Sequence, residues 1–523
     1  MNQMPASIFN DVIGPVMRGP SSSHVAAAAR IGQLIHMSAQ DGVAQAVVDF
    51  DPNGSLAESY HGHGSDIGLV SGLMGMELTD PQMTHALDIA KQKQLDIQFR
   101  ILSYGATHPN NYRMNITDGA GNVHLWEAIS VGGGMIEVQK LDGFSVSICG
   151  DFHELLLLVE HAHFAEIRTL IREHLPHTEQ IDTVNDQTHA LIDIKTAQAV
   201  DPVIVDMLRT HTGVQWVMAL QPVLPTQSRA NCTVPFRCAQ ELLQYAQEHP
   251  GDMWQMATRY ESARGGTTEE DIYQKMKYLA TLMLQCVDIG LKGTEFEDRI
   301  LGPQAYLMDQ AAGKSPQFPS PLLSNIIRNI TSIMEVKSSM GIIIAAPTAG
   351  SCGCLPGIVT GAAQTLGLDI DSMTKGLLAA GLIGVFIAEQ ATFAAEVAGC
   401  QAECGAGSCM AAAALVQMMG GTVQQCVDAA SFAMQNITGL VCDPVANRVE
   451  VPCLGKNIMG GSNALSAAAV ILAGYQNVIP LDQTIRAMYD IGIQLPGELR
   501  CTLGGLGKTP ASMAIRQRLE QLS

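Results

Sequence analysis

The half of the chain that follows residue 236 is rich in Ala, Gly and Met and has the pattern of successive helices. Stretches such as EEDIYQKMKYLATLMLQCV and CMAAAALVQMM place small apolar residues where helices can pack closely, and no strand pattern of comparable strength accompanies them. Charged residues form only 15% of the 523 residues, against roughly 25% in a typical soluble domain. We therefore predict an all-α domain over residues 236–523 with a large buried core.

Two further regions precede this helical half, so the chain is predicted to be multidomain. Residues 1–145 mix alternating, strand-like stretches with helical ones, which is typical of an α+β domain. Residues 146–222 predict a compact series of elements: a strand at 155–159, a helix at 164–174, strands at 181–184 and 190–194, a helix at 202–208 and a strand at 214–220. This βαββαβ order is typical of a small ferredoxin-like module. Residues 223–235, which contain Pro, Thr, Ser and Asn, are predicted to be a linker.

Charge and cysteine usage narrow the classes of partner. The formal net charge is −20 and there is no basic run, which argues against nucleic acid or an acidic membrane surface as a partner. The longest strongly apolar run, residues 376–388, is shorter than the roughly 20 residues that a membrane span needs. The N-terminus lacks the pattern of a secretion signal, and nine of the thirteen cysteines follow residue 350. We expect a cytoplasmic protein with free or metal-bound thiols, and a homodimer.

Two Gly-flanked motifs in the N-terminal region could bind or activate a small molecule. The motif GPSSSH, ending in Ser21, Ser22, Ser23 and His24, precedes an Ala-rich helical run. Free backbone N–H groups and hydroxyls at such a helix start can bind a carboxylate or phosphate, although the motif taken alone favours simple capping by the serines. In GHGSD, glycines flank His63, so that the backbone can approach a ligand closely and the imidazole can act as a base.

The cysteines of the helical half permit several ligand sets. There is no CxxC motif, which argues against a zinc ribbon. Cys400 and Cys404 lie one helical turn apart, whereas Cys442 in VCDP and Cys453 in VPC each stand beside a proline, in loops where a side chain can face a cleft. Buried helical cysteines such as Cys426 more often act as small apolar residues. Spacing alone does not choose among these thiols.

Seven motifs, taken together and in order, resemble those of the iron–sulfur-dependent L-serine dehydratases: GPVMRGPSSSH, GHGSD, HPNN, AAPTAGSCG, GCQAECG, CDPVANRVEVPC and GGLGKTP. The resemblance runs through nearly the whole chain. It implies a beta-type domain at residues 1–145, an ACT-like module at 146–222 and an alpha-type catalytic domain at 236–523, fused in one chain. It further implies conversion of L-serine to pyruvate and ammonia.

The resemblance also implies a set of roles for individual residues. Three cysteines would hold a [4Fe–4S] cluster whose fourth iron stays open to the substrate hydroxyl, without pyridoxal phosphate; they are Cys400, Cys442 and Cys453. The substrate carboxylate would bind Ser21, Ser22, Ser23 and His24, and the base would be His63 or His24. The remaining pocket residues would be Thr348, Ala349, Gly350 and Asn457.

Departures from the family pattern keep alternatives open. Val25 stands where the family usually has Thr, and Cys352, Cys354 and Cys404 are additional thiols. The ACT-like segment lacks the glycine of amino-acid-binding versions, so we predict a structural module rather than a regulatory one. The alternatives are a lyase acting on L-threonine or L-cysteine, a pyridoxal phosphate lyase that uses Lys337, Lys375 or Lys456, and a non-catalytic redox sensor carrying a cluster.

Overall fold

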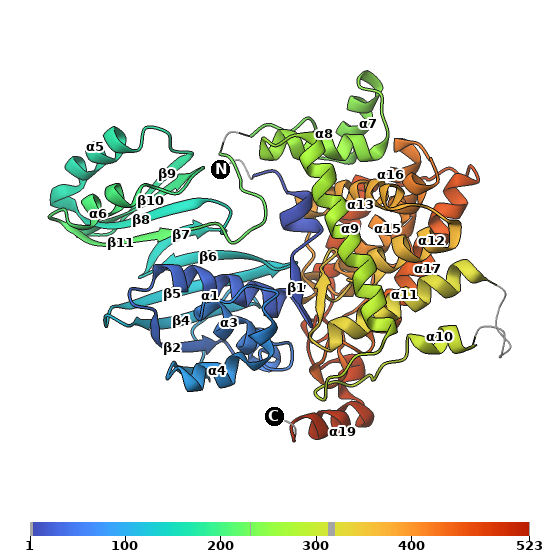
Figure 1. Ribbon diagram of the computed structural model, residues 1–523, viewed down its shortest axis with the longest axis horizontal. Coiled ribbons are helices and arrows are strands. Elements are labelled where there is room, and N and C mark those ends of the chain that lie inside the picture. Colours follow the sequence, from blue (N-terminus) through green and yellow to red (C-terminus); the bar gives the residue numbers. More distant parts are fainter. Residues whose placement is uncertain (1–3, 231, 312–319, 522–523) are drawn as a thin grey trace.

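The structure is a computed structural model that describes residues 4–230, 232–311 and 320–521. Two β-sheets lie beside a large helical part, and the N-terminal segment crosses from one to the other (Figure 1). The sheet-containing regions and the helical region follow the order that the sequence predicts.

A six-stranded sheet, in the order β3-β2-β4-β5-β6-β7, forms the core of the N-terminal region. Its strands are β2 (Val43–Phe50), β3 (Asp96–Ile101), β4 (Asn111–Asp118), β5 (Val123–Gly132), β6 (Met135–Leu141) and β7 (Phe144–Ile148). Strands β2 and β3 are parallel and the other neighbours are antiparallel. Trp126 and Tyr112 are fully buried between the sheet and its helices. These helices are α1 (Ala27–Ser38), α2 (Leu56–Ser59), α3 (Ser65–Leu73) and α4 (Ala86–Gln92).

Helices α1 and α3 cross unusually closely, because glycines replace larger residues at their contact. A Cβ atom at Gly32 would lie 2.6 Å from the Leu69 carbonyl oxygen, and one at Gly64, just before α3, would lie 2.8 Å from a methyl group of Val25. Gly64 also has a φ of +86°, which L-residues rarely adopt. This packing sets the beginnings of α1 and α3 side by side, and with them the two histidine motifs.

The four-stranded sheet has the order β11-β8-β10-β9 with every neighbouring pair antiparallel. Leu155, Leu157 and Ile194 pack against Ile167 in its core. Asp201 caps the second helix, where Pro202 occupies the first helical position. The elements are β8 (His153–Glu160), α5 (Phe164–His174), β9 (Gln180–Asn185), β10 (His189–Thr196), α6 (Pro202–Arg209) and β11 (Val214–Leu220). The predicted βαββαβ order is confirmed, whereas the ACT-like assignment stays a prediction.

The helical part is centred on α13 and α15, which other helices surround. Helix α13 is long and apolar enough to cross a membrane by those two criteria, but 78% of its apolar window is buried inside the fold. Between β11 and α7 the described residues form no helix or strand. The helices are α7 (Ala239–Glu248), α8 (Met253–Gly265), α9 (Glu269–Leu291), α10 (Tyr306–Ala311), α11 (Pro321–Ser338), α12 (Cys354–Leu366), α13 (Ile370–Gln390), α14 (Ala395–Ala398), α15 (Cys404–Met418), α16 (Val423–Gln435), α17 (Cys453–Leu472), α18 (Leu481–Gln494) and α19 (Pro510–Leu519).

The prediction of an all-α C-terminal domain is wrong at one place. Strand β12 (Ile342–Ile344) pairs antiparallel with β1 (Val16–Arg18) near the N-terminus. Three consecutive isoleucines favour extended backbone because branching at Cβ restricts helical rotamers. Just before β1, the helical turn η1 (Ile8–Val12) is buried among the helices of the C-terminal part. The first residues of the chain therefore belong to the core of its second half.

Candidate functional site

The serine motif and the APTAG loop meet between the two halves of the chain. Ser22 begins the helical turn η2 (Ser22–Ala26), and its Oγ accepts a hydrogen bond of 3.1 Å from the Ala349 backbone N–H. Ser21, Ser22, Ser23 and His24 are all buried at this junction. Across it, Thr348, Ala349 and Gly350 lie in the loop between β12 and α12. The structure thus brings together these motifs, which are more than 320 residues apart in the sequence.

His24 is held at both ring nitrogens. Nδ1 lies 2.9 Å from Ser21 Oγ, and Nε2 lies 2.9 Å from Ser59 Oγ. The Ser59 hydroxyl donates its own proton to the Ser55 carbonyl at 2.7 Å, so it accepts from His24 and places the imidazole proton on Nε2. Burial lowers the pKa of His24 to about 3. A neutral, fixed imidazole is well suited to positioning other groups.

His63 contrasts with its neighbour. The two ring centroids are 4.5 Å apart, yet neither His63 Nδ1 nor Nε2 has a hydrogen-bond partner within the described residues. Burial, together with the neighbouring His24 ring and the positive charges of Arg448 and Lys337, holds the pKa of His63 well below its usual range. Its imidazole is therefore neutral and has a free lone pair with which to accept a proton.

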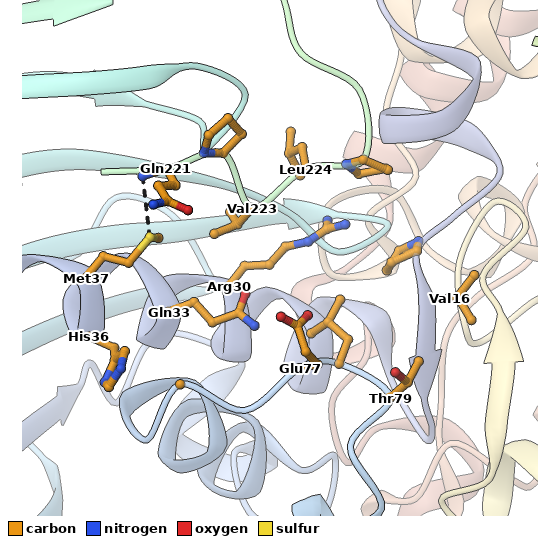
Figure 2. Close-up of a pocket in the computed structure, with 15 residues that line it drawn as sticks. Val16, Arg30, Gln33, His36, Met37, Glu77, Thr79, Gln221, Val223 and Leu224 are labelled. Carbon is orange, nitrogen blue, oxygen red and sulfur yellow. Dashed lines mark hydrogen bonds between the residues drawn. The ribbon is translucent and has the colours of Figure 1, made fainter. Parts of the chain in front are cut away.

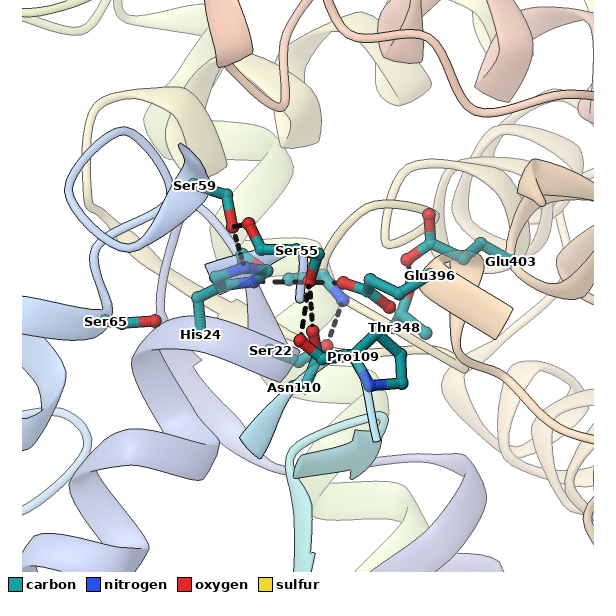
Figure 3. A network of polar contacts seen from close by, with 12 residues as sticks. Ser22, His24, Ser55, Ser59, Ser65, Pro109, Asn110, Thr348, Glu396 and Glu403 are labelled. Carbon is teal, nitrogen blue, oxygen red and sulfur yellow. Dashed lines mark hydrogen bonds and ion pairs between the residues drawn. The ribbon is translucent and has the colours of Figure 1, made fainter. Parts of the chain in front are cut away.

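Two buried glutamates of the helical part complete the polar network, and sequence reasoning missed both. Glu403 accepts a hydrogen bond of 2.7 Å from Thr348 Oγ1, and burial raises its pKa to about 8. Glu396, at the start of α14, places Oε1 4.0 Å from His24 Nδ1. Figure 3 shows both acids facing the serines and His24 of the N-terminal region. The sequence clue to both glutamates was their position near Cys400 in the segment EVAGCQAE.

Unpartnered polar atoms gather at this junction. Besides both nitrogens of His63, Ser130 Oγ has no hydrogen-bond partner among the described residues, and the Asn110 amide and Glu396 carboxyl, each with one atom that lacks a close partner, lie against each other. Asn110 is joined to this site through Ser55, and its carbonyl accepts from the Ser130 N–H. Buried polar groups without partners are rare and costly, so their concentration in one place indicates a site that a polar ligand fills.

Asn457 is close to the site, but its amide is already engaged. Nδ2 donates to the carbonyls of Gly350 and Cys453, each at 2.8 Å, while Oδ1 accepts from the Cys354 N–H at 2.9 Å. The side chain therefore ties the APTAG loop to the start of α17. Its predicted contact with substrate stays a prediction.

Four buried thiols form a cluster behind this network. Cys400 accepts hydrogen bonds from the thiols of Cys404 and Cys442, which hold the pKa of Cys400 well below its usual range. Cys501 completes the cluster, because its N–H donates to the Cys442 carbonyl at 2.9 Å and its thiol contacts that of Cys442. Sequence reasoning missed Cys501; the Gly-rich segment that follows it was the available signal.

Cys453 lies at the start of α17, in the adjoining part of the core. Burial raises the pKa of its thiol, and the nearby negative charges of Cys400 and Glu403 act in the same direction against the cation of Lys337. Cys453 therefore lies close enough to Cys400 for their charges to interact, without joining the four-thiol cluster. Of the predicted ligand set, Cys400 and Cys442 are in contact and Cys453 is nearby.

Among the described residues, no three His, Cys, Asp or Glu side chains converge as ligands of one metal ion. A [4Fe–4S] cluster would make different demands from a single metal ion. Each cysteine thiolate would bind a different iron, so the cysteine sulfur atoms would not need to converge on one point. The donor set, made of buried thiols with one stabilised thiolate, fits an iron–sulfur cluster in its chemistry. Cys404 and Cys501 are additional donors of the same kind.

Two cavities differ in their position relative to the site. One of about 450 Å³ lies where residues 221–225 cross α1, with Arg30, Gln33 and Glu77 in its wall (Figure 2). Its wall contains none of the site residues that the sequence predicts. A smaller one, of about 50 Å³, is bounded by Gly62 and Gly64 on one side and by Arg448 and Val449 on the other. It lies against the backbone of the His63 loop, between the two halves of the chain.

Comparison with known proteins defines the class. The family described as serine dehydratase beta chain matches residues 12–140, and the one described as serine dehydratase alpha chain matches residues 248–506. The chain therefore belongs to the serine dehydratases, and it carries the beta-type and alpha-type parts in a single polypeptide.

Individual relatives match the two parts separately. A probable L-serine dehydratase alpha chain of Bacillus subtilis is 37% identical over 285 residues, which cover 54% of this chain and 95% of the relative. The L-serine dehydratase alpha chain of Peptoniphilus asaccharolyticus is 36% identical over 281 residues, 53% of this chain and 96% of the relative. A probable beta chain from B. subtilis is 40% identical over 161 residues, 31% of this chain and 71% of the relative.

Proposed function

We propose that this protein is an L-serine ammonia-lyase, which dehydrates L-serine to pyruvate and ammonia. The observation that carries the proposal is the group of orphaned polar atoms between the two halves of the chain, with the unpartnered imidazole of His63 among them. Membership of the serine dehydratases and the L-serine dehydratase names of its relatives agree with this substrate.

The cysteines behind the site would hold a [4Fe–4S] cluster through Cys400, Cys442 and Cys453. When bound, such a cluster supplies a Lewis-acidic iron for the β-hydroxyl of the substrate. The chemistry of the donors supports this proposal, because the Cys400 thiolate is stabilised by two neighbouring thiols and by the cation of Lys456. The proposed reaction does not use pyridoxal phosphate, so it gives no lysine the role of binding that cofactor.

Residues of the chain itself would remove the α-proton, position the imidazole of His24 and bind the substrate carboxylate. His63 removes the α-proton, as its free nitrogen allows, while Ser21 and Ser59 hold His24 in place. The hydroxyls and N–H groups around Ser22 and Ser23 bind the substrate carboxylate. The Cα–H electron pair forms the Cα=Cβ double bond as the Cβ–O bond breaks, and the hydroxyl leaves as water after gaining a proton. The enamine product tautomerises to an imine, which water hydrolyses to pyruvate and ammonia.

The test uses anaerobically purified protein reconstituted with iron and sulfide. Wild type is expected to bind iron, to show the broad visible absorbance of an iron–sulfur cluster, and to release pyruvate and ammonia from L-serine in equal amounts. Cys400→Ala, Cys442→Ala and Cys453→Ala should each lose iron and activity. The matched control is Cys426→Ala, because Cys426 is equally buried in α16 and lies outside the thiol cluster.

Two results would contradict the proposal. One is a reconstituted protein that binds no iron and releases no pyruvate from L-serine. The other is pyruvate release by a colourless protein in which borohydride traps a lysine adduct, because such an enzyme would use pyridoxal phosphate. Parallel assays with L-threonine and L-cysteine measure the substrate preference.

A further inference from the structure

Glu396 is a buried acid that reaches from the helical part into the substrate region. Its side chain is 4% exposed and its Oε1 lies 4.0 Å from His24 Nδ1, on the opposite half of the chain. Its second oxygen, Oε2, is buried and has no hydrogen-bond partner within the described residues. Figure 3 shows Glu396 between His24 and Ser55 on one side and Thr348 and Glu403 on the other.

Glu403 and Glu396 differ in the partners of their carboxyl groups. Glu403 accepts the Thr348 hydroxyl at 2.7 Å, and its carboxyl packs where a Cβ atom at Gly350 would come within 2.8 Å of Oε1. Glu396 has the Asn110 side-chain amide and a backbone N–H against its carboxyl, but no lysine or arginine within ion-pair distance in the part of the chain that the structure describes. A buried carboxylate without a cationic partner costs free energy that a ligand with N–H donors and positive charge can offset.

We propose that Glu396 receives the α-ammonium group of the amino-acid substrate. This inference rests on the proposed function, and it names the residue that selects an amino acid over other hydroxy acids. Of the three polar groups of L-serine, the carboxylate would repel Glu396 and the hydroxyl brings one donor and no charge. The ammonium group brings three donors and a positive charge, and so complements the open Oε2.

This assignment also orients the substrate. With the ammonium at Glu396 and the carboxylate at the serines of η2, two of the four substituents of Cα are fixed from opposite halves of the chain. The α-proton and the side chain then occupy the remaining directions. His63 and the thiol cluster lie in the same junction to receive them. Glu396 is thus a substrate-binding residue, and it takes no proton in the reaction.

The test compares two ligands that differ at one group. L-Alanine keeps the ammonium and carboxylate of serine, L-lactate has a hydroxyl in place of the ammonium, and neither carries a β-hydroxyl to eliminate. Both are titrated against anaerobic, iron-loaded protein by calorimetry and used as inhibitors of ammonia release. In Glu396→Gln we expect L-alanine binding and the KM for L-serine to weaken by about 10- to 100-fold, the range for a lost charge-assisted hydrogen bond. L-Lactate binding should change by less than about threefold, since it makes no such bond.

Matched variants separate this role from a structural one. Glu403→Gln removes the other acid, and it should affect L-alanine and L-lactate equally. Glu396→Asp keeps the charge and should retain the preference for L-alanine even if it binds both ligands less tightly. Iron content and melting temperature are measured for each variant.

The inference is overturned if Glu396→Gln weakens both ligands equally or weakens neither, while the wild type remains active on L-serine. A wild type that releases no pyruvate and binds no L-alanine would instead remove the proposed function, and this inference with it. The two failures are therefore distinguishable.

Discussion

At the scale of single residues, two neighbouring histidines have opposite surroundings. His24 is fixed at both nitrogens by Ser21 and Ser59, whereas His63, at a centroid distance of 4.5 Å, has no partner at either nitrogen within the described residues. Glycine also brings the His63 loop close to the helical part, since a Cβ at Gly62 would come within 2.6 Å of the Asn447 carbonyl oxygen. Only a side chain as small as glycine lets the His63 loop lie so close to the helical part.

From this contrast we predict that His63→Asn and His24→Asn differ mainly in kcat. A general base contributes about 10²- to 10⁴-fold, so His63→Asn should lose activity by that factor while it retains iron. In His24→Asn the amide can still accept from Ser21 and donate to Ser59, so kcat should fall by less than about tenfold. Ammonia release by iron-matched samples measures both. Equal losses of kcat would show that His63 has no special role.

The sequence could predict the site residues that stand in local sequence motifs, but not those whose role depends on contacts formed by folding. The serines, His24, His63 and the APTAG loop stand in distinctive Gly- and Ser-rich motifs, and the structure brings them together. Glu396 and Cys501 also lie beside recognisable motifs, but nothing in those motifs singles out these two side chains. Their importance arises from an unpartnered oxygen and from a backbone pairing with Cys442, both of which exist only after folding.

At the scale of elements, the N-terminal turn η1 packs into a groove that glycines of α13 provide. A Cβ at Gly381 would lie 2.7 Å from Ile8 Cγ2, and one at Gly384 would clash with Val12. The Glu261 carboxylate on α8 holds the same turn through the Ser7 hydroxyl and the Ile8 N–H, at 2.5 and 2.8 Å. The elements of the four-stranded sheet were predictable because their patterns are local, whereas this packing joins residues more than 250 positions apart.

We therefore predict opposite effects of alanine at two helical glycines. Gly384→Ala should lower the free energy of unfolding by about 1–3 kcal/mol, because the new methyl group overpacks against Val12. Gly455→Ala, in exposed α17 backbone with open space around it, should raise that free energy by up to about 1 kcal/mol through helix propensity. Urea denaturation of both variants measures the difference. Equal effects of the two substitutions would contradict the proposed groove.

At the scale of the whole molecule, the two halves of the chain form one site between them, and the N-terminal half contributes a strand and a helical turn to the helical half. Strand β1 of the N-terminal half pairs with β12 of the helical half, and η1 enters the helical core. The site itself has His24 on one side, with His63 beside it, and Glu396, Glu403 and the thiols on the other. Relatives in B. subtilis carry the corresponding parts as separate alpha and beta chains. In this chain the β1–β12 pairing and the burial of η1 join the two halves by non-covalent contacts.

We predict that the chain severed after Ala230 and co-expressed as two pieces still assembles and releases pyruvate. The N-terminal piece keeps η1 and β1, so it retains the apolar burial and strand pairing that bind it to the helical piece. Co-elution in size-exclusion chromatography and turnover of the reconstituted complex are the measurements. The control is an N-terminal piece that begins at Gly14 and so lacks η1; it should bind more weakly, because it cannot fill the groove at Gly381 and Gly384. If the complete pieces elute separately, or if removal of η1 leaves their affinity unchanged, the N-terminal turn is not the element that joins the two halves.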